Sequence, residues 1–281
     1  MGVAIVTDST ADLPPDLCEA LNIHVVANII VMNGRSLRDG QDIARSDFYQ
    51  RLPAMTPLPT TATAAPGDYQ ELYEQLLQHG AEAVLSVHAS SQLSGIVNSA
   101  SSAARVFKEK VQVVDSQGVS LSLGFQVIAA AEAAQQGASL ESLMALLEDI
   151  RPRARLIAML DTLEYIRRSG RVSWARARLG NLLRIKPFVE VVKGQVQSLG
   201  EVRTRQKGIE RLRSLLSSQG SLERLALLHT NAEEDALHML ASLEPGLRQQ
   251  LSRPPLIVNV TTIIGTHVGP NGLGFAAVLK S

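Results

Sequence analysis

The stretch "AVLSVHASSQLSG" (residues 83–95) joins an apolar run to a cluster of small polar residues. The apolar run is typical of a buried strand, and the serines and glycine that follow leave room beside the backbone. A helix that begins at about Ser94 would point its unpaired N–H groups and the positive end of its dipole at this turn. The stretch predicts a strand, a turn and a helix, with either an anion site or an ordinary serine cap at the helix start.

Strands and helices alternate on both sides of this stretch in the first half of the chain. Strands that alternate with helices predict a largely parallel sheet with helices packed on it. The predicted strands are residues 3–9, 24–32 and 111–116, and the predicted helices are residues 66–80, 94–107 and 119–135.

The pattern changes after about residue 155. "PFVEVVKGQVQSL" (187–199) predicts a hairpin around Lys193-Gly194, and "RLALLHT" (224–230) and "LIVNVTTIIGTHVG" (256–269) read as further strands around a helix at 232–244. We therefore expect an α/β protein with an N-terminal, mainly parallel α/β domain (1–155) and a C-terminal α+β domain with antiparallel strands (156–281). The cleft between the two domains is the expected ligand site.

The composition excludes several classes of protein. The 281 residues carry 27 Lys and Arg and 27 Asp and Glu, so no overall field favours DNA or an acidic membrane. The single cysteine, Cys18, excludes an internal disulfide and a Cys-rich zinc site. We expect a cytoplasmic protein, because the first residues lack a signal pattern and no segment has the roughly 18 apolar residues of a membrane helix.

Two other polar stretches are candidates for ligand contacts. Thr60, Thr61 and Thr63 precede the helix predicted at 66–80, although a solvated loop would have the same composition. His267 lies among four glycines and a proline directly after a predicted strand. A loop-borne imidazole can donate to a carboxylate and titrates near neutral pH. The five other histidines have no such surroundings and are expected to be structural or superficial.

Arginines gather in the second half of the chain. Six of them, and no acidic residue, lie between Arg167 and Arg184, and Arg203 and Arg205 flank Thr204. A run of like charge is commonly a solvated helix face, but this one could also receive phosphate, nucleic acid or an acidic protein surface.

These stretches together resemble the DegV family. The motifs stand in the family's order and spacing over nearly the whole chain: "IVTDSTADLP" (5–14), "SSQLSG" (90–95), "DTLEYIRRSGRVS" (161–173), "IKP" (185–187), "VRTR" (202–205) and "IGTHVGPNGLG" (264–274).

The resemblance implies a fatty-acid-binding protein. Its best understood members carry the lipid for a bacterial two-component fatty acid kinase, with a long acyl chain buried between the domains and a separate ATP-dependent subunit that phosphorylates the carboxylate. Carried over by position, Thr61, Ser94, Gly95 and His267 would bind the carboxylate, and Arg171, Arg203 and Arg205 would serve kinase docking or phosphoryl transfer. The resemblance implies no catalytic residue in this chain, no metal, no cofactor beyond the fatty acid, no nucleic acid and only transient membrane contact.

The chain departs from the family pattern at two places. Thr61-Ala62-Thr63-Ala64-Ala65 stands where Thr-Ser-Gln-Pro-Ser is common, and "LSGI" replaces the commoner "LSGT", so that Ile96 removes a hydroxyl. Thr61 and Ser94 are retained. The departures therefore concern the rigidity of the loop and the preferred chain length more than capture of the carboxylate.

Two rival functions follow from the same residues. A serine hydrolase would use Ser94 and His267 with Asp8 or Asp115, but Ser94 lacks the Gly-x-Ser-x-Gly elbow. Nucleic-acid binding through residues 167–184 would weaken steeply with salt, whereas lipid binding would not. A kinase activity of the chain itself is not expected, because the sequence has no phosphate-binding loop of a known nucleotide-binding type.

Overall fold

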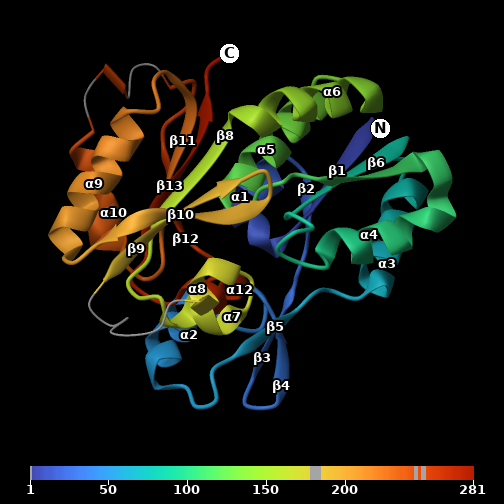
Figure 1. Ribbon diagram of the computed structural model, residues 1–281. Coiled ribbons are helices and arrows are strands. Elements are labelled where there is room, and N and C mark those ends of the chain that lie inside the picture. Colours follow the sequence, from blue (N-terminus) through green and yellow to red (C-terminus); the bar gives the residue numbers. More distant parts are fainter. Residues whose placement is uncertain (1, 178–184, 244–245, 248–250) are drawn as a thin grey trace.

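The computed structural model describes residues 2–177, 185–243, 246–247 and 251–281 (Figure 1). Two sheets form its two halves, and a smaller third sheet lies beside them. In the part of the chain that the model describes, no helix is both long and apolar enough to cross a membrane.

The first sheet is parallel throughout, which confirms the expectation for the first half. Its strand order is β2-β1-β6-β7, with register pairs such as Ile5↔Ile23 and Ile5↔Leu85. The strands are β1 (Val3–Asp8), β2 (Ile23–Val26), β6 (Ala83–His88) and β7 (Val111–Asp115). The helices are α1 (Pro15–Ala20), α3 (Pro66–Gln78), α4 (Ile96–Ala104), α5 (Leu121–Gln135) and α6 (Leu140–Ile150).

The second sheet has the order β10-β9-β8-β13-β11-β12. All neighbours are antiparallel except β11 and β12, which are parallel. The predicted hairpin is β9–β10, and Lys193 and Gly194 in its turn both have positive φ. The elements are β8 (Ala154–Met159), β9 (Lys186–Val192), β10 (Gln195–Val202), α9 (Arg205–Ser217), β11 (Leu222–His229), α10 (Glu233–Ala241), β12 (Leu256–Asn259) and β13 (Leu273–Leu279).

The strand expected at 24–32 is wrong, because the segment is divided between two sheets. After β2 the chain leaves the parallel sheet at Asn28, whose buried side-chain amide donates to Asp8. It then enters a three-stranded antiparallel sheet of order β4-β3-β5, which the sequence did not predict. The elements are β3 (Ile29–Met32), β4 (Arg35–Arg38), α2 (Arg45–Arg51) and β5 (Thr60–Ala62).

The long strand expected at 256–269 is also wrong. It ends with β12 at Asn259, and residues Thr262–Val268 form helix α12. Two buried carboxylates cap this helix: Asp12 accepts from the N–H of Thr261 at 2.7 Å, and Asp39 accepts from the N–H of Thr262 at 3.2 Å. His267 therefore lies in the last turn of a helix and not in a glycine loop.

Helix α5 joins the two large sheets into one packed structure. All residues from Leu121 to Ala131 are buried, because the helix contacts β1 on one side and β8 and β13 on the other. A helix buried on all sides needs apolar residues all round, and "LSLGFQVIAAA" largely provides them. The expected division at 155/156 falls within β8, and it stays a prediction.

Two short helices follow β8, α7 (Glu164–Ser169) and α8 (Ser173–Ala177). Arg168 in α7 pairs with Glu164 at 2.9 Å, so the basic run is partly neutralised there. Arg178 and Arg184, which belong to the same predicted run, lie outside the described residues.

Candidate functional site

Two adjoining cavities lie between the large sheets, with volumes of about 190 and 100 Å³. Five β-branched residues line both cavities, and we call them the collar: Val119, Ile166, Val196, Ile264 and Val268. Because β-branched side chains have few rotamers, the collar is a stiff boundary that the two spaces share. The larger cavity, on one side of the collar, has mainly apolar walls that also carry a group of polar residues, Thr61, Ser94 and His267 among them, and we call it the head cavity.

The head cavity brings together all four residues predicted to bind a carboxylate. Thr61 comes from β5, Ser94 and Gly95 from the start of α4, and His267 from α12. Thr61 and His267 are 206 positions apart in the sequence, and Thr61 Oγ1 lies 2.9 Å from His267 Nε2. The site is therefore assembled by the fold from both halves of the chain.

The imidazole of His267 is neutral at pH 7. Burial, and to a smaller extent the positive charge of Arg171, together lower its pKa to about 4. A neutral imidazole can still donate one hydrogen bond, but it contributes no full charge to the site. This differs from the expected titration near neutral pH, which assumed an exposed loop.

The start of α4 supplies hydrogen-bond donors to the same cavity. Gly95 is the N-cap residue and Ile96 begins the helix, so the first N–H groups have no carbonyl partner within the helix. The Ser94 hydroxyl has no hydrogen-bond partner among the described residues, and its backbone N–H donates to Ser90. A ligand oxygen can therefore be bound here without displacing an existing contact.

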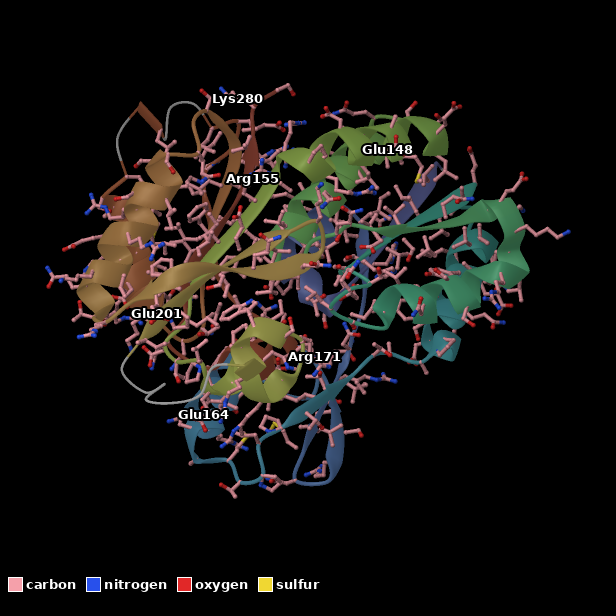
Figure 2. The ribbon with its side chains drawn as sticks, in the orientation of Figure 1. Glu148, Arg155, Glu164, Arg171, Glu201 and Lys280 are labelled. Atoms are coloured by element: carbon pink, nitrogen blue, oxygen red, sulfur yellow. The ribbon has the colours of Figure 1, made fainter. Side chains whose placement is uncertain are left out.

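The three arginines predicted to serve kinase docking lie in three different environments. Arg171 lines the head cavity, and it is the only residue with a permanent charge among the described residues that do so (Figure 2). Arg203 is exposed. Arg205 forms ion pairs with Asp235 and Asp161 and donates to the carbonyl of Asn271 at 2.7 Å.

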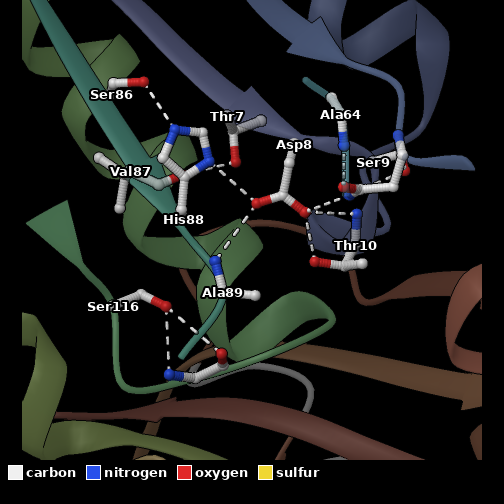
Figure 3. A network of polar contacts seen from close by, with 12 residues as sticks. Thr7, Asp8, Ser9, Thr10, Ala64, Ser86, Val87, His88, Ala89 and Ser116 are labelled. Atoms are coloured by element: carbon white, nitrogen blue, oxygen red, sulfur yellow. Dashed lines mark hydrogen bonds and ion pairs between the residues drawn. The ribbon is translucent and has the colours of Figure 1, made fainter. Parts of the chain in front are cut away.

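A fully buried polar network lies behind the head cavity (Figure 3). One Asp8 oxygen accepts from His88 Nδ1 at 3.0 Å and from the N–H of Ala89 at 3.2 Å. The other accepts from Asn28 Nδ2 at 3.0 Å and from the backbone and hydroxyl of Thr10. Burial alone would raise the pKa of Asp8, but the contacts with His88 and Thr10 outweigh it and hold the pKa below its usual value.

This network positions the wall of the cavity. Thr10, Asn28 and Ala89 all line the head cavity, and each donates a hydrogen bond to Asp8. His88 was expected to be structural or superficial. It is structural, and neither its burial nor its pairing with Asp8 could be read from its sequence neighbours.

The hydrolase alternative has no acidic residue for His267. Asp8 contacts His88, and Asp115 accepts from the backbone and hydroxyl of Ser91. In the described part of the chain, His267 Nε2 contacts Thr61 instead. A nucleophile, base and acid in one hydrogen-bonded row are therefore not found here.

The second cavity, beyond the collar, has apolar walls, and we call it the tail cavity. Leu156, Val189 and Leu228 are among the residues that line it. Three polar side chains lie at its edge and have hydrogen bonds: Ser120 donates to Asp12, Thr230 accepts from the N–H of Gly272, and His229 Nδ1 accepts from the N–H of Ala232. A ligand group that enters this space is expected to be apolar, because almost all of the described wall is apolar. No cluster of three potential metal ligands occurs among the described residues.

The carboxylate that caps α12 gives a testable pH dependence. Burial raises the pKa of Asp12 to about 6, although Arg45 and the hydrogen bonds from Ser120 and Thr261 lower it. The folded state therefore binds the proton of Asp12 more tightly than the unfolded state does. The contribution of this proton to the free energy of unfolding is complete below pH 3.8, the value in the unfolded chain, and is lost as the pH rises through about 6.

We expect Asp12→Asn to remove this dependence, because asparagine has no proton to lose at that position. The free energy of unfolding of the parent, relative to that of the variant, should be greater at pH 4 than at pH 7 by about 2–3 kcal/mol. Urea unfolding of both proteins at the two pH values measures this. An equal difference at pH 4 and pH 7 would show that Asp12 does not titrate in this range.

The fold and the two cavities define an α/β protein with two adjoining cavities between its large sheets, one with a group of polar residues in its wall and the other almost wholly apolar. A family model described as "Uncharacterised protein, DegV family" matches residues 2–280. The chain is 35% identical over 280 residues to a DegV domain-containing protein of Deinococcus radiodurans, with 98% of both chains covered. The chain belongs to the DegV family.

Solved structures agree with this assignment. A DegV family protein from Thermus thermophilus, described as binding fatty acid, matches with a TM-score of 0.91 and 32% identity over 100% of both chains. DegV from Bacillus subtilis, described as a fatty acid binding protein, matches with a TM-score of 0.87 and 32% identity, again over 100% of both chains.

Proposed function

We propose that this protein binds one long-chain fatty acid, with the carboxylate in the head cavity and the acyl chain running through the collar into the tail cavity. The observation that carries the proposal is that the two cavities adjoin each other and share the five collar residues. A ligand with a single polar end and a slender apolar body fits such a space. The descriptions of the Thermus and Bacillus relatives support the same ligand class.

The two ends of the site contribute differently to binding. An acyl chain of about sixteen methylenes gains about 0.8 kcal/mol for each CH₂ that is buried, so the tail supplies most of the affinity. The head cavity supplies orientation through Thr61, Ser94, the start of α4 and neutral His267. Arg171 adds a positive charge at the edge of the head cavity, which favours the ionised form of the acid.

The carboxylate contacts can be tested by substitution. We expect Ser94→Ala and Thr61→Ala each to lower the affinity of the delipidated protein for palmitate roughly tenfold to a hundredfold. A hydrogen bond to a charged group is worth about 1.5–3 kcal/mol. Titration calorimetry with palmitate and with methyl palmitate measures the effect.

The ester provides the control, because it cannot present a carboxylate. The affinity of the parent for methyl palmitate should be no higher than that of the Ser94→Ala variant for palmitate, because the ester loses the charge that all the carboxylate contacts share. If both variants bind palmitate as tightly as the parent does, the carboxylate lies elsewhere in the cavity. Turnover of an acyl ester by the parent would instead support the hydrolase.

The protein would then act as a carrier that presents the carboxylate to a separate ATP-dependent kinase subunit, which forms the acyl phosphate. This finer proposal rests on the family motifs and on the exposure of Arg203 close to the start of α9. A guanidinium on the surface can hold an acidic partner or a phosphoryl group by paired hydrogen bonds. The ion pairs of Arg205 would orient this part of the surface.

Substitution of Arg203 tests whether fatty acid binding and presentation of the carboxylate to the kinase subunit depend on different residues. We expect Arg203→Ala to leave palmitate affinity within twofold of the parent value and to lower acyl phosphate formation by tenfold or more. Calorimetry measures the first, and hydroxylamine trapping in the presence of the kinase subunit and ATP measures the second. Exposed Lys207, on the next helix, provides a matched control as Lys207→Ala. Equal losses of lipid binding and phosphorylation in Arg203→Ala would contradict the docking role.

A further inference from the structure

A separate cleft, which is neither the head cavity nor the tail cavity proposed for the fatty acid, opens where the loop after β7 meets the β9–β10 hairpin. Its volume is about 530 Å³, enough for a small molecule and more than one or two waters need. Val191 lines both this cleft and the tail cavity, so the two spaces are neighbours across the sheet. The hairpin is fixed in place, because Ser90 donates to the carbonyl of Gly194 at 2.9 Å.

A buried acceptor without a partner lies in the wall of this cleft. Gln126 is 1% exposed, and its Nε2 donates to the carbonyls of Ser116 and Ser122 at 3.1 and 2.9 Å. Because both of these partners are acceptors, the orientation of the amide is settled. Its Oε1 is buried and has no hydrogen-bond partner among the described residues. Buried polar atoms nearly always have a hydrogen-bond partner, so we expect this oxygen to accept from a donor that is not part of the described chain.

Cations without a carboxylate partner among the described residues line the same cleft, and of these Arg155 donates to the backbone carbonyls of Pro152 and Ala154. Arg151, Arg155 and Lys193 form no ion pair within the described part of the chain, and the Arg151 Nε is buried without a partner. The neighbouring Arg153, which does not line the cleft, contacts both Asp149 and Glu223. The three cations that line the cleft thus differ from Arg153, which does not line it, because Arg153 has carboxylate partners and they have none among the described residues.

Two carboxylates complete the wall. Glu148 from α6 and Glu190 from β9 also line the cleft and form no ion pair among the described residues. Figure 2 shows Glu148 and Arg155 on α6 and β8, two of the elements that contribute to the wall. Guanidinium and ammonium groups bind phosphate oxygens, whereas carboxylates and an amide oxygen accept from hydroxyl groups. We propose that this cleft binds a small phosphate ester that carries hydroxyl groups, such as a phosphorylated polyol.

Three probes separate the parts of this proposal when they are titrated into the whole protein by calorimetry. Glycerol 3-phosphate carries both kinds of group, inorganic phosphate only the anion and glycerol only the hydroxyls. We expect saturable one-to-one binding of glycerol 3-phosphate, at least tenfold weaker binding of phosphate and no saturable binding of glycerol. A cleft that holds solvent only would bind none of them. Equal binding of phosphate and glycerol 3-phosphate would also overturn the proposal, because the hydroxyl acceptors would then have no role.

Variants place the binding in this cleft. Arg151→Gln and Gln126→Met should each lower the affinity for glycerol 3-phosphate tenfold or more, and exposed Arg105, which does not line the cleft, is the control as Arg105→Gln. Arg155→Gln provides a second cation variant if Gln126→Met fails to fold. Unchanged affinity in the arginine variants would overturn the assignment. The fatty acid content of all the variants should equal that of the parent, so this test stands apart from the proposed function.

Discussion

Replacing Val196 by tryptophan is expected to lower the affinity for palmitate by a hundredfold or more. Val196 is one of the collar residues, and it lies on β10 where the head and tail cavities meet. An indole at this position would close the boundary between the two cavities, and the part of the acyl chain in the tail cavity would then no longer be buried. The loss of about six buried CH₂ groups would cost about 5 kcal/mol, which exceeds a hundredfold change.

A control on the same strand distinguishes blockage from damage to the fold. Gln197 follows Val196, is exposed and points to the other face of the sheet, so Gln197→Trp should bind palmitate as the parent does. Circular dichroism and thermal unfolding should show both variants folded. Val196→Trp that binds palmitate normally would mean that the acyl chain does not pass through the collar.

Removing the carboxylate of Asp8 is expected to have the largest effect on stability. In Asp8→Ala the buried donors of His88, Ala89 and Asn28 lose their acceptor. Leaving such a buried group unpaired costs about 3–5 kcal/mol. Urea unfolding at pH 7 should show a loss of this size.

A neighbouring carboxylate tests whether the loss is specific. Glu74 is exposed on α3, next to the buried Tyr73 that contacts Ser86 in the same network, and Glu74→Ala should change the free energy of unfolding by less than about 0.5 kcal/mol. Asp8→Asn keeps one acceptor oxygen and should fall between the two. A loss below about 1 kcal/mol in Asp8→Ala would show that the network does not support the cavity wall.

The parallel sheet and the β9–β10 hairpin could be predicted because their signals are local. Apolar runs that end in small polar residues mark β1 and β6, and Lys193-Gly194 marks a tight turn by itself. The start of α4 was predictable for the same reason. Ser94 and Gly95 could be selected as candidates because such a turn points unpaired N–H groups at one place, and the resemblance to the family then favoured an anion site over an ordinary serine cap.

Helix α12 could not be predicted from its own residues. "TIIGTHV" is rich in β-branched residues, which favour strands, and a short apolar run does not distinguish strand from helix. Asp12 and Asp39, which cap the helix, lie more than 200 positions away in the sequence. The same holds for Arg171, whose place in the head cavity depends on how α7 packs against α12.

The small sheet of β3, β4 and β5 gave no usable pattern either. Its edge strand β4 reads "RSLR", and polar edge strands have weak alternation and many charged residues. Thr61 lies in a stretch that looks like a loop in the sequence, and it was selected from the family resemblance. In the structure it belongs to β5 and pairs with Ile30 of β3. This pairing fixes the direction of its side chain toward His267.

Native mass spectrometry of the protein, purified without detergent, tests the central claim most directly. We expect a single added mass per chain that corresponds to a long-chain fatty acid, lost on delipidation and restored by one equivalent of palmitate. We also expect that the Val196→Trp variant carries no such mass. A parent protein that is empty as purified and takes up no fatty acid after delipidation would contradict the account.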